Sequence, residues 1–244
     1  NSIVIEEFLT GPEVSVLCFT DGKTIVPMVS SMDHKRALDN DEGLNTGGLG
    51  TVAPNPCYTE EIAKECMNNI FLPAVEAMNK EGRTFKGCLY FGLMLTPKGA
   101  KVIEYNCRFG DPETQVVLPL LKSDLLEIMQ AVEDERLADV NVEFSDGAAC
   151  CVVVASKGYP QKYETGFEVT EGKLPENATV FHAGTKLFEN RIVTSGGRVL
   201  GVTATDENLV KAVAEAYNAV KFVHFDNEYY RKDIGKKALD KLAD

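Results

Sequence analysis

The segment from Val102 to Glu113 carries the side chains best suited to chemistry. Glu104 and Asn106 are separated by one residue, so on a β-strand they are expected to share one face. A carboxylate and an amide oxygen on one face are suitable ligands for a hard cation such as Mg²⁺, which often takes only one or two ligands from protein. An isolated Glu-x-Asn pattern more often lies on a solvated sheet face. The adjoining string Arg108-Phe-Gly-Asp-Pro-Glu113 favours the metal site, because its Gly and Pro would turn two acidic side chains toward the same strand end.

Arg108 continues the predicted face that carries Glu104 and Asn106. Its planar guanidinium is suited to bind a phosphoryl group or a carboxylate through two parallel hydrogen bonds. These side chains together predict a site for a metal ion and an anionic ligand.

A second candidate group lies between residues 30 and 56, where hydrophobic periodicity is absent and a long structureless loop is expected. The stretch contains Asp33-His-Lys-Arg36 and Asn45-Thr-Gly-Gly-Leu-Gly50. Consecutive glycines leave backbone N–H groups free to approach a phosphate, and the lysine and arginine add positive charge. Taken alone, the glycines are more typical of a surface turn. His34 alone is more typical of a hydrogen-bonded polar residue than of a catalyst, although an imidazole titrates near neutral pH.

The opening segment, Ser2–Phe8, is predicted to be a β-strand. Alternation along the strand places Glu6 and Glu7 on opposite faces, so at most one of them faces a given cleft. Glu13 follows the Gly11-Pro12 turn and is suited to accept hydrogen bonds from a ribose diol. An edge strand with solvated acidic residues is the alternative interpretation. Because the sequence opens in mid-strand, we expect a fragment of a longer polypeptide.

Hydrophobic patterns and turn residues predict the elements that must position these groups. Two β-hairpins are expected, over 14–29 with a turn at Asp21-Gly22 and over 88–107 with a turn at 97–99. Helices are expected from a Thr59 cap to about residue 78, with a kink at Pro73, and from a Ser123 cap to about residue 136. Beyond a composition break near residue 146, an apolar strand at 148–156, a Gly-rich strand region to residue 205, and helices at about 207–221 and at the C-terminus are expected.

The composition argues against several classes of function. Lys and Arg number 25 against 37 Asp and Glu, for a formal net charge of −12, so no binding to nucleic acid or to an anionic membrane surface is expected. No apolar stretch approaches the length of a membrane span. The seven cysteines include no C-x-x-C pair, so a zinc site or a disulfide scaffold is not expected. A reducing, cytoplasmic location is the prediction that follows.

In order and spacing, these segments resemble the glycinamide ribonucleotide synthetase (phosphoribosylamine–glycine ligase) family of ATP-grasp ligases. The matching strings up to Glu113 are Val4-Ile-Glu-Glu-Phe-Leu9, Asp33-His-Lys-Arg36, Asn45-Thr-Gly-Gly48, Val102-Ile-Glu104 with Asn106, and Arg108-Phe-Gly-Asp-Pro-Glu113. The later ones are Gly158-Tyr-Pro160, His182-Ala-Gly-Thr-Lys186, Gly196-Gly-Arg-Val-Leu200 and Arg231-Lys-Asp-Ile-Gly235. The resemblance spans nearly the whole chain, and the Arg-Phe-Gly-Asp-Pro-Glu string is its most specific part.

The resemblance implies an α+β fold. Residues 1–145 would form the second half of an ATP-grasp unit, an antiparallel sheet with helices, and residues 146–244 a small β-rich C-terminal domain. The implied reaction is ATP-dependent ligation of glycine to 5-phosphoribosylamine through a glycyl phosphate, a step of purine synthesis, with ATP and Mg²⁺ or Mn²⁺ as cofactors. The N-terminal domains of the same polypeptide, with the phosphate-binding lysines, are expected upstream, so the chain alone is expected to be inactive.

The resemblance also implies roles for individual residues. Glu6 and Phe8 would line the adenine pocket, and Glu13 would bind the ribose. Glu104 and Asn106 would hold the metal ion, and Arg108 and Asp111 would orient glycine or the transferring phosphoryl group as catalytic residues. The substrate or phosphate loop would comprise Asp33, His34, Lys35, Asn45, Thr46, Gly47 and Gly48.

Two other functions stay open at this point. The chain could belong to another ATP-grasp carboxylate–amine ligase of purine synthesis, although the strings Arg108–Glu113 and Arg231–Gly235 favour glycine. It could instead be a non-catalytic nucleotide-binding module. The presence of both metal-ligand candidates beside an intact Arg108–Glu113 string argues against a decayed site.

Overall fold

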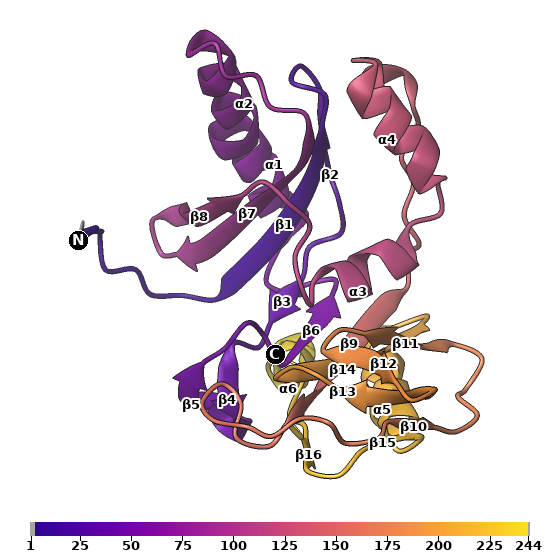
Figure 1. Cartoon of the computed structure of the whole chain (residues 1–244). Helices are drawn as coiled ribbons and strands as arrows, with labels where there is room; N and C mark the ends of the chain where they lie inside the picture. The colour runs from indigo at the N-terminus through magenta and orange to yellow at the C-terminus, as the bar shows by residue number, and fades with distance from the viewer. Residues whose placement is uncertain (1–2, 244) are drawn as a thin grey trace.

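The computed structural model describes residues 3–243, which form two antiparallel sheets with helices packed against them (Figure 1). A four-stranded sheet lies in the upper part of Figure 1, and a six-stranded sheet lies in the lower part. Three hydrophobic clusters stabilise the fold: one between the first sheet and its helices, one between the two sheets, and one beneath the second sheet. None of the helices within residues 3–243 has the length and apolar character needed to cross a membrane.

The first sheet has the strand order β2–β1–β7–β8. Its strands are β1 (Glu13–Thr20), β2 (Ile25–Pro27), β7 (Gly87–Thr96) and β8 (Gly99–Asn106), which confirms both predicted hairpins. At the first turn, the Asp21 carboxylate accepts hydrogen bonds from the N–H groups of Lys23 and Thr24, at 2.9 and 2.6 Å. Because β8 is an edge strand, its candidate metal ligands lie at the border of the sheet.

The helix that covers one face of this sheet changes its winding at the centre. Helices α1 (Glu60–Cys66) and α2 (Leu72–Lys80) flank a π-helical segment, Met67–Phe71. Thr59 caps α1 as predicted, because its hydroxyl accepts from the N–H of Ile62. Pro73 has no N–H, and its ring crowds the preceding turn, so the wider π-helical turn directly before it accommodates the proline.

The second sheet has the order β11–β14–β9–β6–β3, and β16 also pairs with β9. Its central strand, β9 (Ala148–Ser156), is buried at every residue, as the apolar run predicts. The other strands are β3 (Met32–Asp33), β6 (Gly50–Ala53), β11 (Ala178–His182), β14 (Arg198–Asp206) and β16 (Glu228–Tyr229). Helix α5 (Leu209–Val220) packs on β9 and β14, and α6 (Lys236–Ala243) contributes the buried Ala238 to the same core.

The stretch from residue 30 to 56, expected to be a structureless loop, is instead a structured connection between the two sheets. β3 pairs with β6, and β6 pairs with β9. Between them, β4 (Arg36–Leu38) and β5 (Glu42–Asn45) form a hairpin across the short turn Asp39–Asp41. The strands are too short to show a hydrophobic period. The domain division at residues 145 and 146 stays a prediction, because two strands from the first part lie in the sheet of the second.

Helices α3 (Thr114–Val117) and α4 (Leu125–Glu133) follow the first sheet, with short 3-10 turns at Leu118–Leu120 and Leu137–Asp139. The predicted Ser123 cap of α4 is wrong by one residue. The Asp124 carboxylate accepts from the N–H of Leu126 at 2.8 Å, whereas the Ser123 hydroxyl donates to the carbonyl oxygen of Asn141. The serine is therefore engaged by a neighbouring segment and the adjacent acid takes the cap position.

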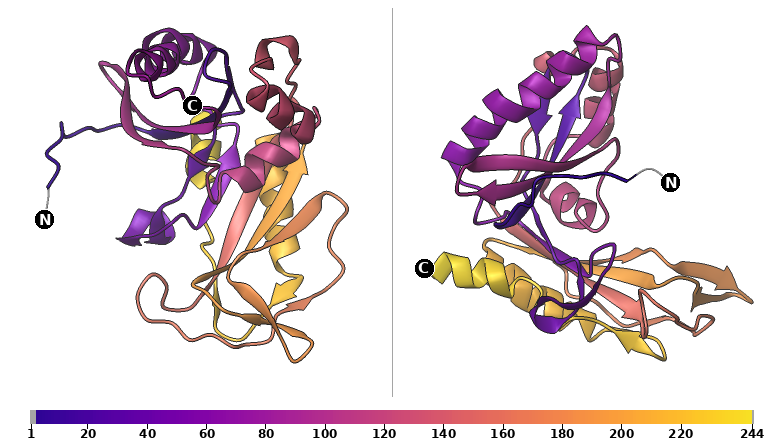
Figure 2. Two further views of the ribbon diagram at one scale, coloured as in Figure 1. Left: turned by 45° about the horizontal axis from the view of Figure 1, so that its top comes forward. Right: turned by 90° about the vertical axis from the view of Figure 1, so that its left-hand side faces the viewer.

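The remaining strands form two small pairs. β12 (Thr185–Phe188) and β13 (Arg191–Thr194) form a hairpin, and β10 (Thr170–Glu171) pairs with β15 (Val223–His224). The predicted N-terminal strand is wrong over residues 3–8, which extend away from the rest of the fold (Figure 2). Within residues 3–243 this segment has no pairing strand, and an unpaired strand is not stable in water. Ser2 lies outside the described residues.

Candidate active site

Glu104 and Asn106 lie at the end of β8 with their side chains in contact. The amide nitrogen Nδ2 of Asn106 donates to Oε1 of Glu104 at 3.2 Å. Tyr105, between them, packs instead on Phe91, with ring centroids 5.4 Å apart. No cluster of three His, Cys, Asp or Glu side chains suited to a metal ion occurs within residues 3–243. The carboxylate and amide oxygens fit Mg²⁺ or Mn²⁺, since such ions accept few protein ligands and retain water.

The turn after β8 presents one exposed cation and one restrained carboxylate. Arg108 is exposed, and its Nη1 donates to the carbonyl oxygen of Phe109 at 2.8 Å. Asp111 has both carboxylate oxygens engaged: Oδ1 accepts from Nε2 of Gln115 at 2.9 Å, and Oδ2 accepts from Nη2 of Arg198 at 3.1 Å. Arg108 is therefore accessible to an anionic ligand, whereas Asp111 is held by its protein partners.

Glu113 is expected to lie beside the end of β8, but the structure buries it, with 5% of the residue exposed. Its Oε1 accepts hydrogen bonds from the hydroxyl of Tyr90 at 2.9 Å and from that of Ser15 at 3.3 Å. Burial and the neighbouring Glu113 raise the pKa of Tyr90, so the phenol stays protonated and donates. This network attaches the 108–113 turn to β1 and β7.

Asp33 and Lys35 enter the same region from β3 and the residues that follow it. Burial and the negative charge of Glu113 raise the pKa of the Asp33 carboxyl well above its usual range. Nζ of Lys35 pairs with Oε2 of Glu13 at 2.6 Å. Burial lowers the pKa of Lys35, but the contact with Glu13 outweighs burial and raises it overall. Glu13 is the predicted ribose ligand. Its carboxylate is already paired with Lys35, so a ribose hydroxyl would compete with the lysine for it.

The glycines of the 45–50 turn do not leave their amides free. The N–H of Gly47 donates to the Tyr159 hydroxyl at 3.1 Å, and the N–H of Gly48 donates to Oγ1 of Thr46 at 3.0 Å. Asn45 is exposed at the end of β5. The expectation of open amides is wrong in this conformation. That the turn binds substrate or phosphate stays a prediction.

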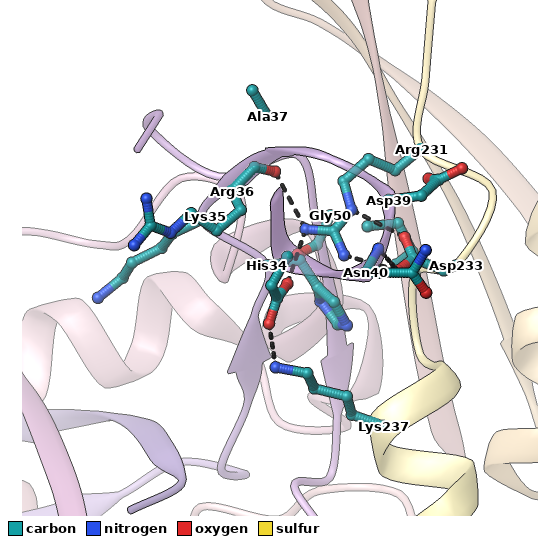
Figure 3. A network of polar contacts seen from close by, with 12 residues as sticks. His34, Lys35, Arg36, Ala37, Asp39, Asn40, Gly50, Arg231, Asp233 and Lys237 are labelled. Atoms are coloured by element: carbon teal, nitrogen blue, oxygen red, sulfur yellow. Dashed lines mark hydrogen bonds and ion pairs between the residues drawn. The ribbon is translucent and has the colours of Figure 1, made fainter. Parts of the chain in front are cut away.

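His34 lies beside Gly50, at the end of the glycine turn (residues 45–50), and is 3% exposed (Figure 3). Its Nδ1 is 3.1 Å from the carbonyl oxygen of Gly50, and its Nε2 is 3.1 Å from the N–H of Gly235. These partners require a neutral ring with the proton on Nδ1. Burial, followed by the positive charge of Arg231, lowers the pKa of His34 to about 4. Through these two hydrogen bonds the ring connects Gly50, at the start of β6, to Gly235, directly before α6.

The free energy of unfolding is expected to fall as the pH is lowered from 6.5 to about 4, because of His34. An unfolded histidine takes up a proton near pH 6.5, whereas the folded ring resists protonation until about pH 4. The unfolded state binds more protons in this window, so stability rises with pH across it by about 3 kcal/mol in total. Urea unfolding at several pH values, compared between the wild-type chain and His34→Gln, measures this contribution. Identical pH dependence of the two proteins would contradict it.

Arg231 is the centre of a buried ion-pair network and is 1% exposed (Figure 3). Nε and Nη2 donate to the Asp233 carboxylate at 2.8 and 2.9 Å, and Nη1 donates to the carbonyl oxygen of Arg36 and pairs with Asp41, each at 3.0 Å. Lys237 also pairs with Asp41. Burial raises the pKa of Asp233, but the hydrogen bonds from Arg231 outweigh it and hold that pKa at about 2. The network attaches the β4–β5 hairpin to the segment before α6.

The Arg231→Met substitution is expected to lower the free energy of unfolding by about 3–5 kcal/mol, because it leaves the partly buried Asp233 carboxylate without its cation and the Arg36 carbonyl oxygen without its donor. Methionine keeps most of the side-chain length, so loss of packing is small. Arg191→Met on β13 is the matched control, since that guanidinium is 52% exposed and its ion pairs are solvated. Urea unfolding at neutral pH measures both variants. Equal stability of the two variants would show that the network contributes little.

Local sequence patterns predict no role for Arg198 and Arg231, two residues of this region. Their partners lie far along the chain: Asp111 is 87 positions from Arg198, and Arg36 is 195 positions from Arg231. No local spacing connects such pairs. The only signal was that each arginine lies within a string that carried the family resemblance.

Glu6 and Phe8, predicted to line an adenine pocket, are exposed in the extended N-terminal segment, Phe8 by 91%. Ile5 is similarly exposed, by 89%. No adenine pocket is formed around them in the part of the chain that the structure covers. Their roles stay predictions.

Comparison with solved structures defines the class of protein. The fold matches a biotin carboxylase of Campylobacter jejuni with a TM-score of 0.65 and 14% identity, over 92% of this chain and 48% of that one. It matches a phosphoribosylamine–glycine ligase of Thermotoga maritima with a TM-score of 0.85 and 35% identity, over 94% of this chain and 57% of that one. The fold is thus that of the ATP-grasp enzymes, and the predicted α+β class is confirmed.

Sequence comparison then identifies the family. Residues 1–114 match the phosphoribosylglycinamide synthetase ATP-grasp (A) domain, and residues 149–237 match the C domain of the same synthetase. The phosphoribosylamine–glycine ligase of Clostridium acetobutylicum is 49% identical over 236 residues, which cover 97% of this chain and 56% of that protein. The chain belongs to the phosphoribosylglycinamide synthetase family, and it spans about half the length of this curated relative.

Proposed function

We propose that this chain forms part of a phosphoribosylamine–glycine ligase. In the proposed reaction the γ-phosphoryl group of ATP passes to the glycine carboxylate, and the amine of 5-phosphoribosylamine displaces phosphate to form the amide. The observation that carries the proposal is the contact of Glu104 with Asn106, beside the exposed Arg108, in a chain of this family. This set combines candidate metal ligands with a cation for an anionic substrate.

Glu104 and Asn106 would hold Mg²⁺ or Mn²⁺, which when bound neutralises negative charge on phosphate oxygens. Arg108 would bind the glycine carboxylate or the transferring phosphoryl group through two hydrogen bonds from its planar guanidinium. Asp111 orients the same turn through its hydrogen bonds to Gln115 and Arg198. These residues position reactants and stabilise charge, which is most of what phosphoryl transfer requires of a protein.

An acyl phosphate is readily hydrolysed, so the site must exclude water while the amine attacks. The segments Asp33–Lys35 and Asn45–Gly48 are the candidate substrate or phosphate loop, and the glycine turn lies against the 108–113 turn, where a Cβ on Gly48 would be 2.6 Å from Cδ of Pro112. Glu6 and Phe8 would contact adenine, and Glu13 the ribose, once further domains of the same polypeptide complete the nucleotide pocket. A cytoplasmic location stays a prediction.

A chimeric enzyme tests the proposal. The N-terminal part of the Clostridium acetobutylicum relative, up to the residue aligned with Asn1, is joined to this chain. ADP formation that depends on both glycine and 5-phosphoribosylamine is the expected result. ATP turnover with a different carboxylate and not with glycine would identify another ligase. A folded chimera that binds ATP without any turnover would support the non-catalytic alternative.

A further inference from the structure

Gly47 and Gly48 are glycines because other groups occupy the space of their side chains. A Cβ on Gly47 would lie 3.0 Å from both Cζ and Nη2 of Arg198. The φ angle of Gly47 is outside the left-handed region, so an alanine there is opposed by this contact and not by the backbone. A Cβ on Gly48 would lie 2.5 Å from Oδ1 of Asp33, and its φ of +104° is unfavourable for other residues as well.

Arg198, at the start of β14, joins two segments that are distant in sequence. Its Nη1 donates to the carbonyl oxygens of Gly47 at 2.7 Å and of Asp111 at 2.8 Å, and its Nη2 donates to Oδ2 of Asp111 at 3.1 Å. The guanidinium side chain is 21% exposed. Hydrogen bonds from a charged, planar donor of this kind are stronger than neutral ones, and their geometry is specific. One side chain of the C-terminal region therefore holds the glycine turn against the 108–113 turn.

A second contact from the same region supports this arrangement. The hydroxyl of Tyr159 accepts from the N–H of Gly47 at 3.1 Å. The Tyr159 ring packs on Gly197, where a Cβ would lie 2.2 Å from Cδ2 of the ring. Gly197, directly before Arg198, thus makes room for the tyrosine that binds the turn. Both the N–H and the carbonyl oxygen of Gly47 are therefore hydrogen-bonded to side chains of the C-terminal region.

We propose that Arg198 is a positioning residue that fixes the glycine turn, residues 45–50, against the 108–113 turn, and that Gly47 lacks a side chain to admit its guanidinium. The proposal deepens the proposed function, because both turns belong to the candidate substrate site. The C-terminal region thereby sets the relative position of the two turns. Arg198 acts through its partners and does not touch the reacting atoms.

Amide hydrogen exchange on the 244-residue chain tests the proposal independently of catalysis. The reporters are Thr46, whose N–H donates to the carbonyl oxygen of Lys35 at 2.8 Å, and Leu49, whose N–H donates to that of His34 at 2.9 Å. Arg198→Ala is expected to accelerate exchange at both by at least about tenfold, or about 1.4 kcal/mol. The amides of α5 should be unaffected, which would exclude global unfolding. Arg191→Ala on β13 is the matched control and should change neither reporter.

A double variant separates the specific contact from a general loosening. Gly47→Ala alone is expected to accelerate exchange in the same direction as Arg198→Ala, because a Cβ there would lie 3.0 Å from Cζ and Nη2 of Arg198 and the guanidinium must shift. In the double variant Gly47→Ala/Arg198→Ala the alanine should add nothing further, whereas independent effects would add. Additive effects, or unchanged reporters in Arg198→Ala, would overturn the proposal. If Arg198→Ala does not fold, Arg198→Lys serves in the same cycle, since an ammonium lacks the fork that spans both turns.

The KM values of the chimeric ligase distinguish a positioning role from a merely structural one, because a loss of folded enzyme does not change KM. Arg198→Lys is expected to raise the KM for glycine, the KM for ATP or both at least about tenfold, because the two turns carry the candidate ligands of glycine and of the phosphates and each tenfold change corresponds to about 1.4 kcal/mol of binding. A loss of folded enzyme would lower kcat and leave both KM values unchanged, which would count against the positioning role. If the wild-type chimera has no activity, the proposed function fails, while the exchange experiment still decides the role of Arg198.

Discussion

The Glu104→Gln substitution is expected to lower glycine-dependent turnover of the chimeric ligase by about a thousandfold. Removing one charged ligand weakens charge neutralisation that contributes several kcal/mol to phosphoryl transfer, and about 4 kcal/mol corresponds to that factor. Thermal stability should change little, because Glu104 is exposed and the contact it makes on β8 is with the Asn106 amide at 3.2 Å. Glutamine keeps the shape of the side chain and an oxygen acceptor, so the substitution isolates the charge.

The control for this experiment is Glu127→Gln on α4, an exposed glutamate on a separate element outside the candidate site. It should leave turnover unchanged and lower the free energy of unfolding by no more than about 1 kcal/mol, because Glu127 lies in the first turn of α4. The two variants are compared by initial rates over a range of Mg²⁺ concentrations and by thermal unfolding. Near-wild-type turnover of Glu104→Gln at saturating Mg²⁺ would remove the metal role from this residue.

The parts of the fold that the sequence predicted are those that depend on local patterns. The Asp21-Gly22 turn between apolar runs predicts the first hairpin, and the apolar run at 148–156 predicts β9, because alternation, turn residues and burial act over a few positions. The Glu104–Asn106 pairing follows from the same period of two. Such features need no knowledge of distant partners.

The features of the fold that the sequence did not predict depend on contacts between residues far apart in the chain. β6 pairs with β9, which lies about a hundred residues further on, and its four residues are too few to show a period. Glu113 is acidic and belongs to a turn string, yet it is buried because Tyr90 and Ser15 supply donors from β7 and β1. Arg231 is buried for a similar reason, since the Asp41 carboxylate and the Arg36 carbonyl oxygen reach it from a distant segment and the neighbouring Asp233 completes its set of acceptors. Composition alone assigns all such residues to the surface.

The 244-residue chain alone is expected to fold but to show no binding of Mg-ATP at micromolar concentrations. Folding is expected because each sheet has its own buried core, from Val14 and Phe91 in the first to Val152 and Phe225 in the second. Binding of ATP is not expected, because the side chains assigned to adenine are exposed and do not pack on the rest of the chain. Phe8 is 91% exposed in the N-terminal segment, and Glu13 is paired with Lys35.

The expected deficit in affinity is large. Each charge-assisted contact to a phosphate contributes on the order of 1.5–3 kcal/mol, and an unformed adenine pocket removes apolar burial as well. Two or three missing contacts therefore weaken binding by several powers of ten, since about 1.4 kcal/mol is a tenfold change. Isothermal titration of the chain with Mg-ATP measures this, and the chimeric ligase, with a completed pocket, is the positive control. Micromolar binding by the chain alone, or glycine-dependent release of phosphate from it, would show that these residues form a nucleotide site without further domains.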